Sequence, residues 1–156
     1  MRLSTLLLKA AYSLMRLRWR IMRPVTFGVR IMLIRNEQVL LVDHTYLNMW
    51  HFPGGHIHRG EMPMDAARRE AYEEAGVTCN QEPWLLGIFT NFVEGKTDNI
   101  ALFVCEEFTV GERSDSWEIA EQRFFPFDAL PDNAAPACQR RLADYLDGRG
   151  PYAKQW

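Results

Sequence analysis

The sequence predicts an α/β fold in which helices pack on a mixed β-sheet. Two observations support this fold class. Short apolar runs with strand-like composition recur along the chain, and helical segments with amphipathic periodicity are interspersed among them. The chain has 156 residues, of which 47% are hydrophobic and 24% are charged, which is enough for one domain with its own core.

The first 23 residues form a segment with its own charge pattern. They contain six basic residues and no acidic residue, whereas the rest of the chain contains twelve basic and twenty acidic residues. Apolar residues recur at spacings of three and four, which predicts an amphipathic helix over residues 3–22, ended by Pro24. Two interpretations stay open. The helix packs on its own domain or on a second subunit, or it is a basic amphipathic helix that lies on an anionic membrane surface.

After Pro24, strands and helices alternate along the chain. Strands are predicted over residues 25–34, 39–42, 85–92, 99–108 and 122–126, with turns at 35–38 and 94–98. Pro63 and Gly76 mark the two ends of a helix over residues 63–75, and a last helix spans 136–146 before Gly148. We therefore divide the chain into the N-terminal helix (1–23), one domain (24–150) and a C-terminal tail (151–156).

Composition excludes several classes of protein. A net charge of −2 argues against a domain that binds nucleic acid, so no specific nucleic-acid partner is expected. The three cysteines are far apart and form no CxxC pair, which favours a reducing cytoplasm over a disulfide framework or a zinc ribbon. No apolar run reaches the length of about 18 residues that a membrane span requires. We expect a cytoplasmic protein, with a peripheral position at the inner membrane surface as the alternative set by residues 1–23.

The helix at 63–75 carries the chemistry. Glu70, Glu73 and Glu74 are spaced i, i+3 and i+4, so they share one helix face although like charges at this spacing are destabilising. Alanines on the adjacent side allow close packing on a sheet. Carboxylates on a rigid helix suit Mg²⁺, which takes oxygen ligands and bridges them to substrate phosphates. The pattern suggests metal-assisted attack of water on a phosphate ester or anhydride.

The segment GHIHRGEMPMDAARREAYEEAGV, residues 55–77, resembles the Nudix box. Every charged and glycine position of the family pattern is matched, by Gly55, Glu61, Arg69, Glu70, Glu73, Glu74 and Gly76, and the aliphatic position after Gly76 is matched by Val77. Ala71 departs from the pattern because it is smaller than the usual aliphatic residue, which should alter packing rather than chemistry. The resemblance implies a Nudix-type α/β/α sandwich with a mixed sheet.

The resemblance also implies roles for the residues of the box. Glu70, Glu73 and Glu74 would bind Mg²⁺ or Mn²⁺ together with the Gly55 carbonyl. Glu70 is the first choice for activating the water, and Arg69 would orient the glutamates, which makes Glu70, Glu73 and Arg69 the expected catalytic set. Glu61 and Gly54 would support the junction between loop and helix.

Outside the box the assignments are more open. Either Glu118 or Glu121 is a candidate for an additional acid, because Nudix enzymes often take one from this region. His44, Tyr46, Trp50 and His51 are candidates for substrate contact, with aromatic core packing as the alternative for Tyr46 and Trp50. The four histidines fall within residues 44–58, so a transition-metal site was also considered.

The resemblance implies a divalent-metal-dependent hydrolase of phosphoric anhydride bonds. Such a pyrophosphohydrolase would cleave the diphosphate linkage of a small nucleoside diphosphate derivative. ADP-ribose, a nucleotide sugar and a nucleoside triphosphate are the candidate substrates. The alternative is a protein that keeps the fold but binds without turnover, as a nucleotide sensor or a membrane-docked interaction protein.

Overall fold

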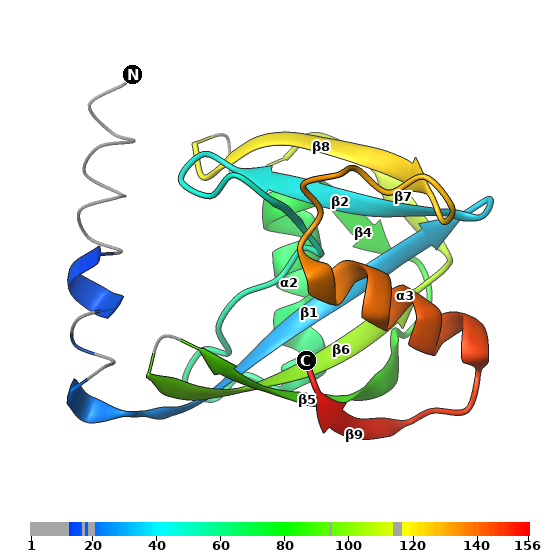
Figure 1. Cartoon of the computed structure of the whole chain (residues 1–156). Helices are drawn as coiled ribbons and strands as arrows, with labels where there is room; N and C mark the ends of the chain where they lie inside the picture. The colour runs from blue at the N-terminus through cyan, green and yellow to red at the C-terminus, as the bar shows by residue number, and fades with distance from the viewer. Residues whose placement is uncertain (1–12, 17, 19–20, 94, 114–116) are drawn as a thin grey trace.

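The computed structural model describes residues 13–16, 18, 21–93, 95–113 and 117–156. Within these residues, a mixed sheet lies between helices α2 and α3 (Figure 1). In chain order the elements are β1 (Val25–Arg35), β2 (Gln38–His44), β3 (Trp50–His51), α2 (Pro63–Ala75), β4 (Val77–Cys79), β5 (Trp84–Val93), β6 (Lys96–Cys105), β7 (Phe108–Val110), β8 (Ile119–Pro126), α3 (Pro136–Asp147) and β9 (Tyr152–Gln155).

The sheet combines parallel and antiparallel pairs. Among the described residues, seven strands form one sheet in the order β3-β2-β1-β6-β5-β9, and β8 pairs with β2 outside that order. β1 runs parallel to β6, and β5 runs antiparallel to β6. β1 and β2 meet only at the end of β1, where Ile34 pairs with Val39 and Arg35 with Gln38. The two covering helices and the mixed sheet confirm the predicted α/β/α sandwich.

The two sheet faces bury different sets of side chains. In β1, Ile31 and Leu33 belong to the core cluster under α2, whereas Met32 and Ile34 belong to the cluster that contains buried residues of α3. This alternation follows from the period of two along a strand. Both faces of β1 are therefore covered, which explains why its sequence is a continuous apolar run. The three cysteines of the chain are free and buried.

The predicted hairpin and the ends of both helices are confirmed. Asn36 and Glu37 have φ values of 51° and 57°, as in the tight two-residue turns that connect antiparallel strands. α2 has the predicted bounds, and Gly76 ends it with φ of 60° and an N–H directed at the carbonyls of Ala71 and Tyr72. α3 extends one residue beyond the prediction, to Asp147, and Gly148 ends it in the same way.

Short strands were not predicted. The apolar run expected as one strand over residues 99–108 is divided, because β6 ends at Cys105 and Phe108 opens the separate strand β7. β7 pairs with β4 in a small second sheet. The exposed pair Glu106 and Glu107 lies at the break, where charged side chains interrupt the apolar pattern.

The C-terminal residues are part of the sheet rather than a tail. Residues 151–156 were expected to form a tail, but Tyr152–Gln155 form β9, which runs parallel to β5. The Tyr152 hydroxyl donates to the Asp147 carboxylate (2.7 Å), and the Trp156 ring lies 5.8 Å from the Phe89 ring. Two aromatic side chains thus attach this segment to the α3 side of the core.

The N-terminal helix was predicted over residues 3–22. Of this range, residues 13–16, 18, 21 and 22 are helical and exposed, and residues 3–12, 17, 19 and 20 lie outside the described residues. Within the part of the chain that the structure describes, no helix has both the length and the apolar character needed to cross a membrane.

Candidate active site

The acidic face of α2 lines a cleft of about 420 Å³. The cleft lies where α2 meets the end of β2 and the loop that follows β3. Its lining residues come from these segments, from β1, from the residues after β2 and from the residue before β8: Arg30, His44, Tyr46, Leu47, Gly54, Gly55, His56, His58, Arg69, Glu70, Glu73, Glu74 and Glu118. The fold thus brings most of the predicted site residues to one place.

Glu74 links α2 to two neighbouring segments. Its Oε1 lies 3.1 Å from Nε2 of His44 at the end of β2, and its Oε2 accepts a hydrogen bond from the Gly54 N–H at 2.8 Å. Both carboxylate oxygens have partners, and the side chain is buried with only 7% exposed. Burial of a carboxylate is favourable only with such partners. Glu74 therefore fixes the loop of Gly54 against the helix.

Gly54 and Gly55 occupy positions where a side chain does not fit. A Cβ at Gly54 would lie 2.2 Å from the Val29 carbonyl oxygen, and a Cβ at Gly55 would lie 2.6 Å from Oε1 of Glu70. The Gly55 carbonyl accepts a hydrogen bond from the Val29 N–H at 2.9 Å. A carbonyl oxygen has two lone pairs, so this bond leaves one for a further partner. The backbone here approaches the carboxylates as closely as glycine allows.

Arg30 binds the backbone of the same loop through two hydrogen bonds. Its Nη1 donates to the carbonyl oxygens of Phe52 (2.9 Å) and Gly54 (2.8 Å). Arg30 is not among the site residues predicted from the sequence. The available signal was a single charge within the otherwise apolar strand predicted over residues 25–34, since a charge in a buried strand needs a specific partner.

Arg69 is the centre of the ion-pair network on α2. Its Nη1 donates to Glu70 (2.7 Å) and Glu73 (3.0 Å), and its Nε donates to Glu61 (2.8 Å). Nη2 reaches the His56 carbonyl at 2.9 Å and the second oxygen of Glu61 at 3.1 Å. The planar guanidinium has the donors needed to hold several carboxylates at once, which a lysine lacks.

The pKa values of two carboxyl groups in this network differ from their ordinary values. The hydrogen bonds from Arg69, and then that from the His58 N–H, lower the pKa of Glu61 to about 2. Burial raises the pKa of Glu70, although the hydrogen bond from Arg69 acts in the opposite direction. Glu73 is the more open of the two carboxylates, with 43% of its side chain exposed. Glu70 and Glu73 therefore face the cleft in different environments.

The structure separates the two candidate acids after the box. Glu118 lines the cleft, and its carbonyl accepts a hydrogen bond from the Thr45 N–H at 2.8 Å, next to the end of β2. Glu121 is paired across the sheet with Asp43, and its carboxylate accepts hydrogen bonds from Arg123. Of the two, only Glu118 is among the residues that line the cleft.

Of the four predicted substrate contacts, two line the cleft and two do not. His44 and Tyr46 line the cleft, with ring centroids 5.3 Å apart. Trp50 is buried against the Phe125 ring at 4.9 Å, so it contributes to the core. The His51 ring lies edge-on to the His44 ring, with ring centroids 5.9 Å apart. Burial, and then the charges of Arg30 and His44, lower the pKa of His51 to about 3, so its ring is neutral at physiological pH.

The donor set fits a hard divalent cation. Oxygen ligands on a rigid helix, beside a loop that a Cβ would fill, match the preference of Mg²⁺ and Mn²⁺. As they lie, the carboxylates are turned toward Arg69, His44 and Gly54, and no three His, Cys, Asp or Glu side chains of the described residues converge as a metal-binding group. The histidines of the described residues do not form such a group either, since His44, His56 and His58 line the cleft and His51 is not among its lining residues.

Comparison with known proteins identifies the family. The family model of the NUDIX domain matches residues 23–146. The chain belongs to the Nudix family. Over 64 residues it is 41% identical to an RNA pyrophosphohydrolase of Bartonella bacilliformis, covering 35% of this chain and 38% of that protein. Over 85 residues it is 39% identical to diphosphoinositol polyphosphate phosphohydrolase 2 of Rattus norvegicus, covering 54% of this chain and 44% of that protein.

Solved Nudix structures share the fold. The crystal structure of the MutT NUDIX hydrolase from Burkholderia pseudomallei is similar with a TM-score of 0.70 and 20% identity, over 77% of this chain and 97% of that one. At this identity the likeness concerns the fold alone. The matches cover less than half the length of the two curated relatives. The family of this Nudix domain is therefore established, and its substrate is a separate question.

Proposed function

We propose that this Nudix domain is a divalent-metal-dependent pyrophosphohydrolase that cleaves the diphosphate linkage of a nucleoside diphosphate derivative. One observation carries the proposal. Glu70 and Glu73 are held by Arg69 on the wall of a cleft that the glycine loop at Gly54 and Gly55 also lines. Carboxylates, a guanidinium and closely approaching backbone are the groups that bind a metal and orient a diphosphate.

The metal would be held by Glu70, Glu73, Glu74 and the carbonyl of Gly55. When bound, Mg²⁺ or Mn²⁺ would polarise a phosphoryl oxygen and lower the pKa of water. Arg69 fixes the directions of the carboxylates. His44 and the Gly54 N–H keep Glu74 at the base of the cleft.

Glu70 is the proposed base that accepts the proton of the attacking water. Burial raises the pKa of this carboxyl, and a base whose pKa is closer to neutral accepts a proton more readily. Glu118 is the second candidate, because it lines the same cleft from the position just before β8.

The cleft also supports a phosphate-bearing substrate. Arg30, His56 and His58 line it and offer hydrogen-bond donors, and Tyr46 offers a ring for stacking on a base. ADP-ribose, nucleotide sugars and nucleoside triphosphates all meet these requirements. The names of the relatives add RNA and diphosphoinositol polyphosphates to the substrates that should be tested.

A substrate panel with Mg²⁺, analysed by product mass, tests the proposal. Glu73→Gln and Glu70→Gln should each lower kcat by about 10² to 10⁴-fold, the usual contribution of a positioned acid or base. Glu121→Gln is the matched control, since Glu121 is a glutamate held outside the cleft by Arg123. Unchanged hydrolysis in the Glu73→Gln enzyme would refute the assignment. Tight nucleotide binding without any product would instead favour a sensor.

A further inference from the structure

The described part of the N-terminal helix exposes large apolar side chains. Leu14 and Ile21 are 73% and 76% exposed, and Met15 and Met22 are exposed as well. Together with Arg18 they line an open groove of about 450 Å³. At the helical period of about 100° per residue, the sequence spacing of these five positions predicts a common side within about 120°. We call these five exposed residues the Leu14–Met22 face.

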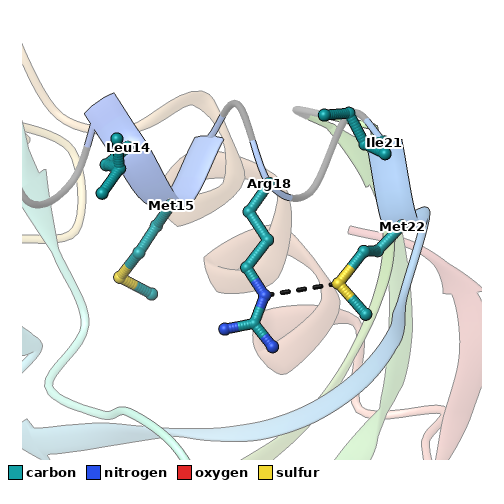
Figure 2. A pocket seen from close by; sticks show the side chains of 5 residues that line it. All are labelled: Leu14, Met15, Arg18, Ile21 and Met22. Atoms are coloured by element: carbon teal, nitrogen blue, oxygen red, sulfur yellow. Dashed lines mark hydrogen bonds between the residues drawn. The ribbon is translucent and has the colours of Figure 1, made fainter.

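A cation lies within this apolar face. Figure 2 shows Met15, Arg18 and Met22 extending in the same direction, and the Arg18 Nε donates to the Met22 sulfur at 3.3 Å. A long arginine side chain covers apolar surface with its stem and keeps its charge at the edge. The face therefore presents both apolar groups and a positive charge to whatever covers it.

The charge of the surrounding segment is of one sign. Residues 1–23 contain six basic residues and no acidic one, while the remaining residues carry a net charge of −8. The family match begins only at residue 23, so the basic segment lies outside the Nudix domain. Nothing in the Nudix fold accounts for this charge. The segregation indicates an anionic partner.

A second exposed apolar patch lies at the start of β1 and near the end of β5. Val25 and Phe92 both neighbour Thr97 in the sheet register, so their side chains point to the same face. Val25 is 75% exposed and Phe92 is 69% exposed. Two residues separate Met22, the last described helical residue, from Val25 at the start of β1, so one member of this second patch follows the helix closely in the chain (Figure 1).

We infer that the Leu14–Met22 face binds an anionic lipid surface. Apolar side chains of such a helix enter the boundary between headgroups and acyl chains, and its arginines bind lipid phosphates. Symmetric pairing of this segment with that of a second copy fits less well, because it brings like charges together and neither segment contains an acidic residue. Nucleic acid would use the arginines but would leave Leu14 and Ile21 in water.

Vesicle flotation of the full chain tests this inference. The protein should float with vesicles rich in phosphatidylglycerol and stay at the bottom with vesicles of pure phosphatidylcholine. High salt should weaken the association, since the screening length falls from about 10 Å at 0.1 M to about 3 Å at 1 M. Absence of flotation with the anionic vesicles, or equal flotation with both, overturns the inference.

Point variants separate the lipid from other partners. Ile21→Ser should weaken vesicle binding about tenfold and Arg18→Gln about fivefold. Leu146→Ser is the matched control, because Leu146 is 62% exposed on α3, and it should bind vesicles like the wild type. All three should keep the wild-type circular dichroism spectrum. Unchanged vesicle binding by Ile21→Ser contradicts the inference.

Two further measurements identify the competing partners. Sedimentation velocity that shows a dimer in the wild type and a monomer in Ile21→Ser would assign the face to a second copy. Binding to a single-stranded oligonucleotide that is lost in Arg18→Gln and kept in Ile21→Ser would assign it to nucleic acid. Either result overturns the lipid assignment.

Discussion

The helices α2 and α3 are built on the same frame but pack on the sheet with different side chains. Each begins with a proline and ends at a glycine with positive φ, of 60° in Gly76 and 66° in Gly148. Against the sheet, α2 places fully buried alanines, whereas α3 places larger side chains such as Cys138 and Leu142. Small side chains let a helix lie close to its neighbours, so the glutamates of α2 reach the glycine loop.

The buried charges of the two helices differ in the same way. On α3, the Nε of Arg141 lies 2.7 Å from Oδ2 of Asp144. The Cζ of its guanidinium lies 4.0 Å from the centre of the Phe89 ring. The Asp144 carboxylate is also bound by Lys154, so this group is neutralised within the protein. On α2, Arg69 faces Glu61, Glu70 and Glu73 at once. The carboxylates around Arg69 thus outnumber the one cation that they share.

The largest expected effect is a loss of stability on the α3 side of the core, without a change in catalysis. Leu142 is buried against the aromatic core, so Leu142→Ala should lower the free energy of unfolding by about 2 to 5 kcal/mol. The kcat should stay at the wild-type value at temperatures where the variant is folded. Urea unfolding followed by fluorescence measures the first quantity. Leu146→Ala, at an exposed position of the same helix, should change stability by only about 0.5 kcal/mol.

At the cleft, by contrast, a substitution should lower kcat. In Gly55→Ala the new Cβ would lie 2.6 Å from Oε1 of Glu70, so the carboxylate must move. A displacement of about 1 Å in a catalytic group costs about 100-fold in rate, so kcat should fall by about that factor. Gly111→Ala is the control, since its Cβ would make an ordinary contact of 3.7 Å with the Gly76 carbonyl. Wild-type kcat in Gly55→Ala would show that the rate does not depend on the position of the Glu70 carboxylate.

The smallest expected effect is a difference in how the α2 side and the α3 side of the sheet contribute to stability as the pH changes. The pKa of Glu61 is lowered from 4.5 to about 2, so the stability it contributes is present above pH 4.5 and is lost as the pH falls toward 2. The pKa of Tyr145 on α3 is raised from 10.0 to about 12 by burial and by its hydrogen bond to Glu106. Its contribution is present below pH 10 and is lost as the pH rises toward 12.

Melting temperatures across pH measure these two windows. Glu61→Gln should flatten the acid limb of the curve, and Tyr145→Phe should flatten the alkaline limb. Each variant should leave the other limb unchanged, because the two groups belong to separate networks. An acid limb with the wild-type slope in Glu61→Gln would show that the bond to Arg69 adds no stability.

Local signals made the catalytic helix predictable from the sequence. Pro63 and Gly76 specify the ends of α2 through the backbone alone, and the spacing of the glutamates requires only a helical period. The hairpin at Asn36 and Glu37 was predictable for the same reason. By contrast, β3, β4 and β7 have only two or three residues each, too few for a strand period to appear in the sequence.

Other features depend on contacts between distant residues. The pairing of His44 with Glu74 joins positions 30 residues apart, and no local pattern indicates it. The choice between Glu118 and Glu121 depends on the register of β8 against β2, which is irregular between Asp43 and His44. Sequence reasoning therefore identified the acids but not which of them the sheet turns toward the cleft.

Every nitrogen of the Arg69 guanidinium donates to an oxygen of this network. The carboxylates of the box thus carry a resident counter-ion that belongs to the polypeptide itself. A domain arranged in this way can complete its folding before any cation arrives. In the proposed metal-dependent mechanism, the cation would then join Arg69 beside these carboxylates instead of meeting a cluster of unpaired negative charge.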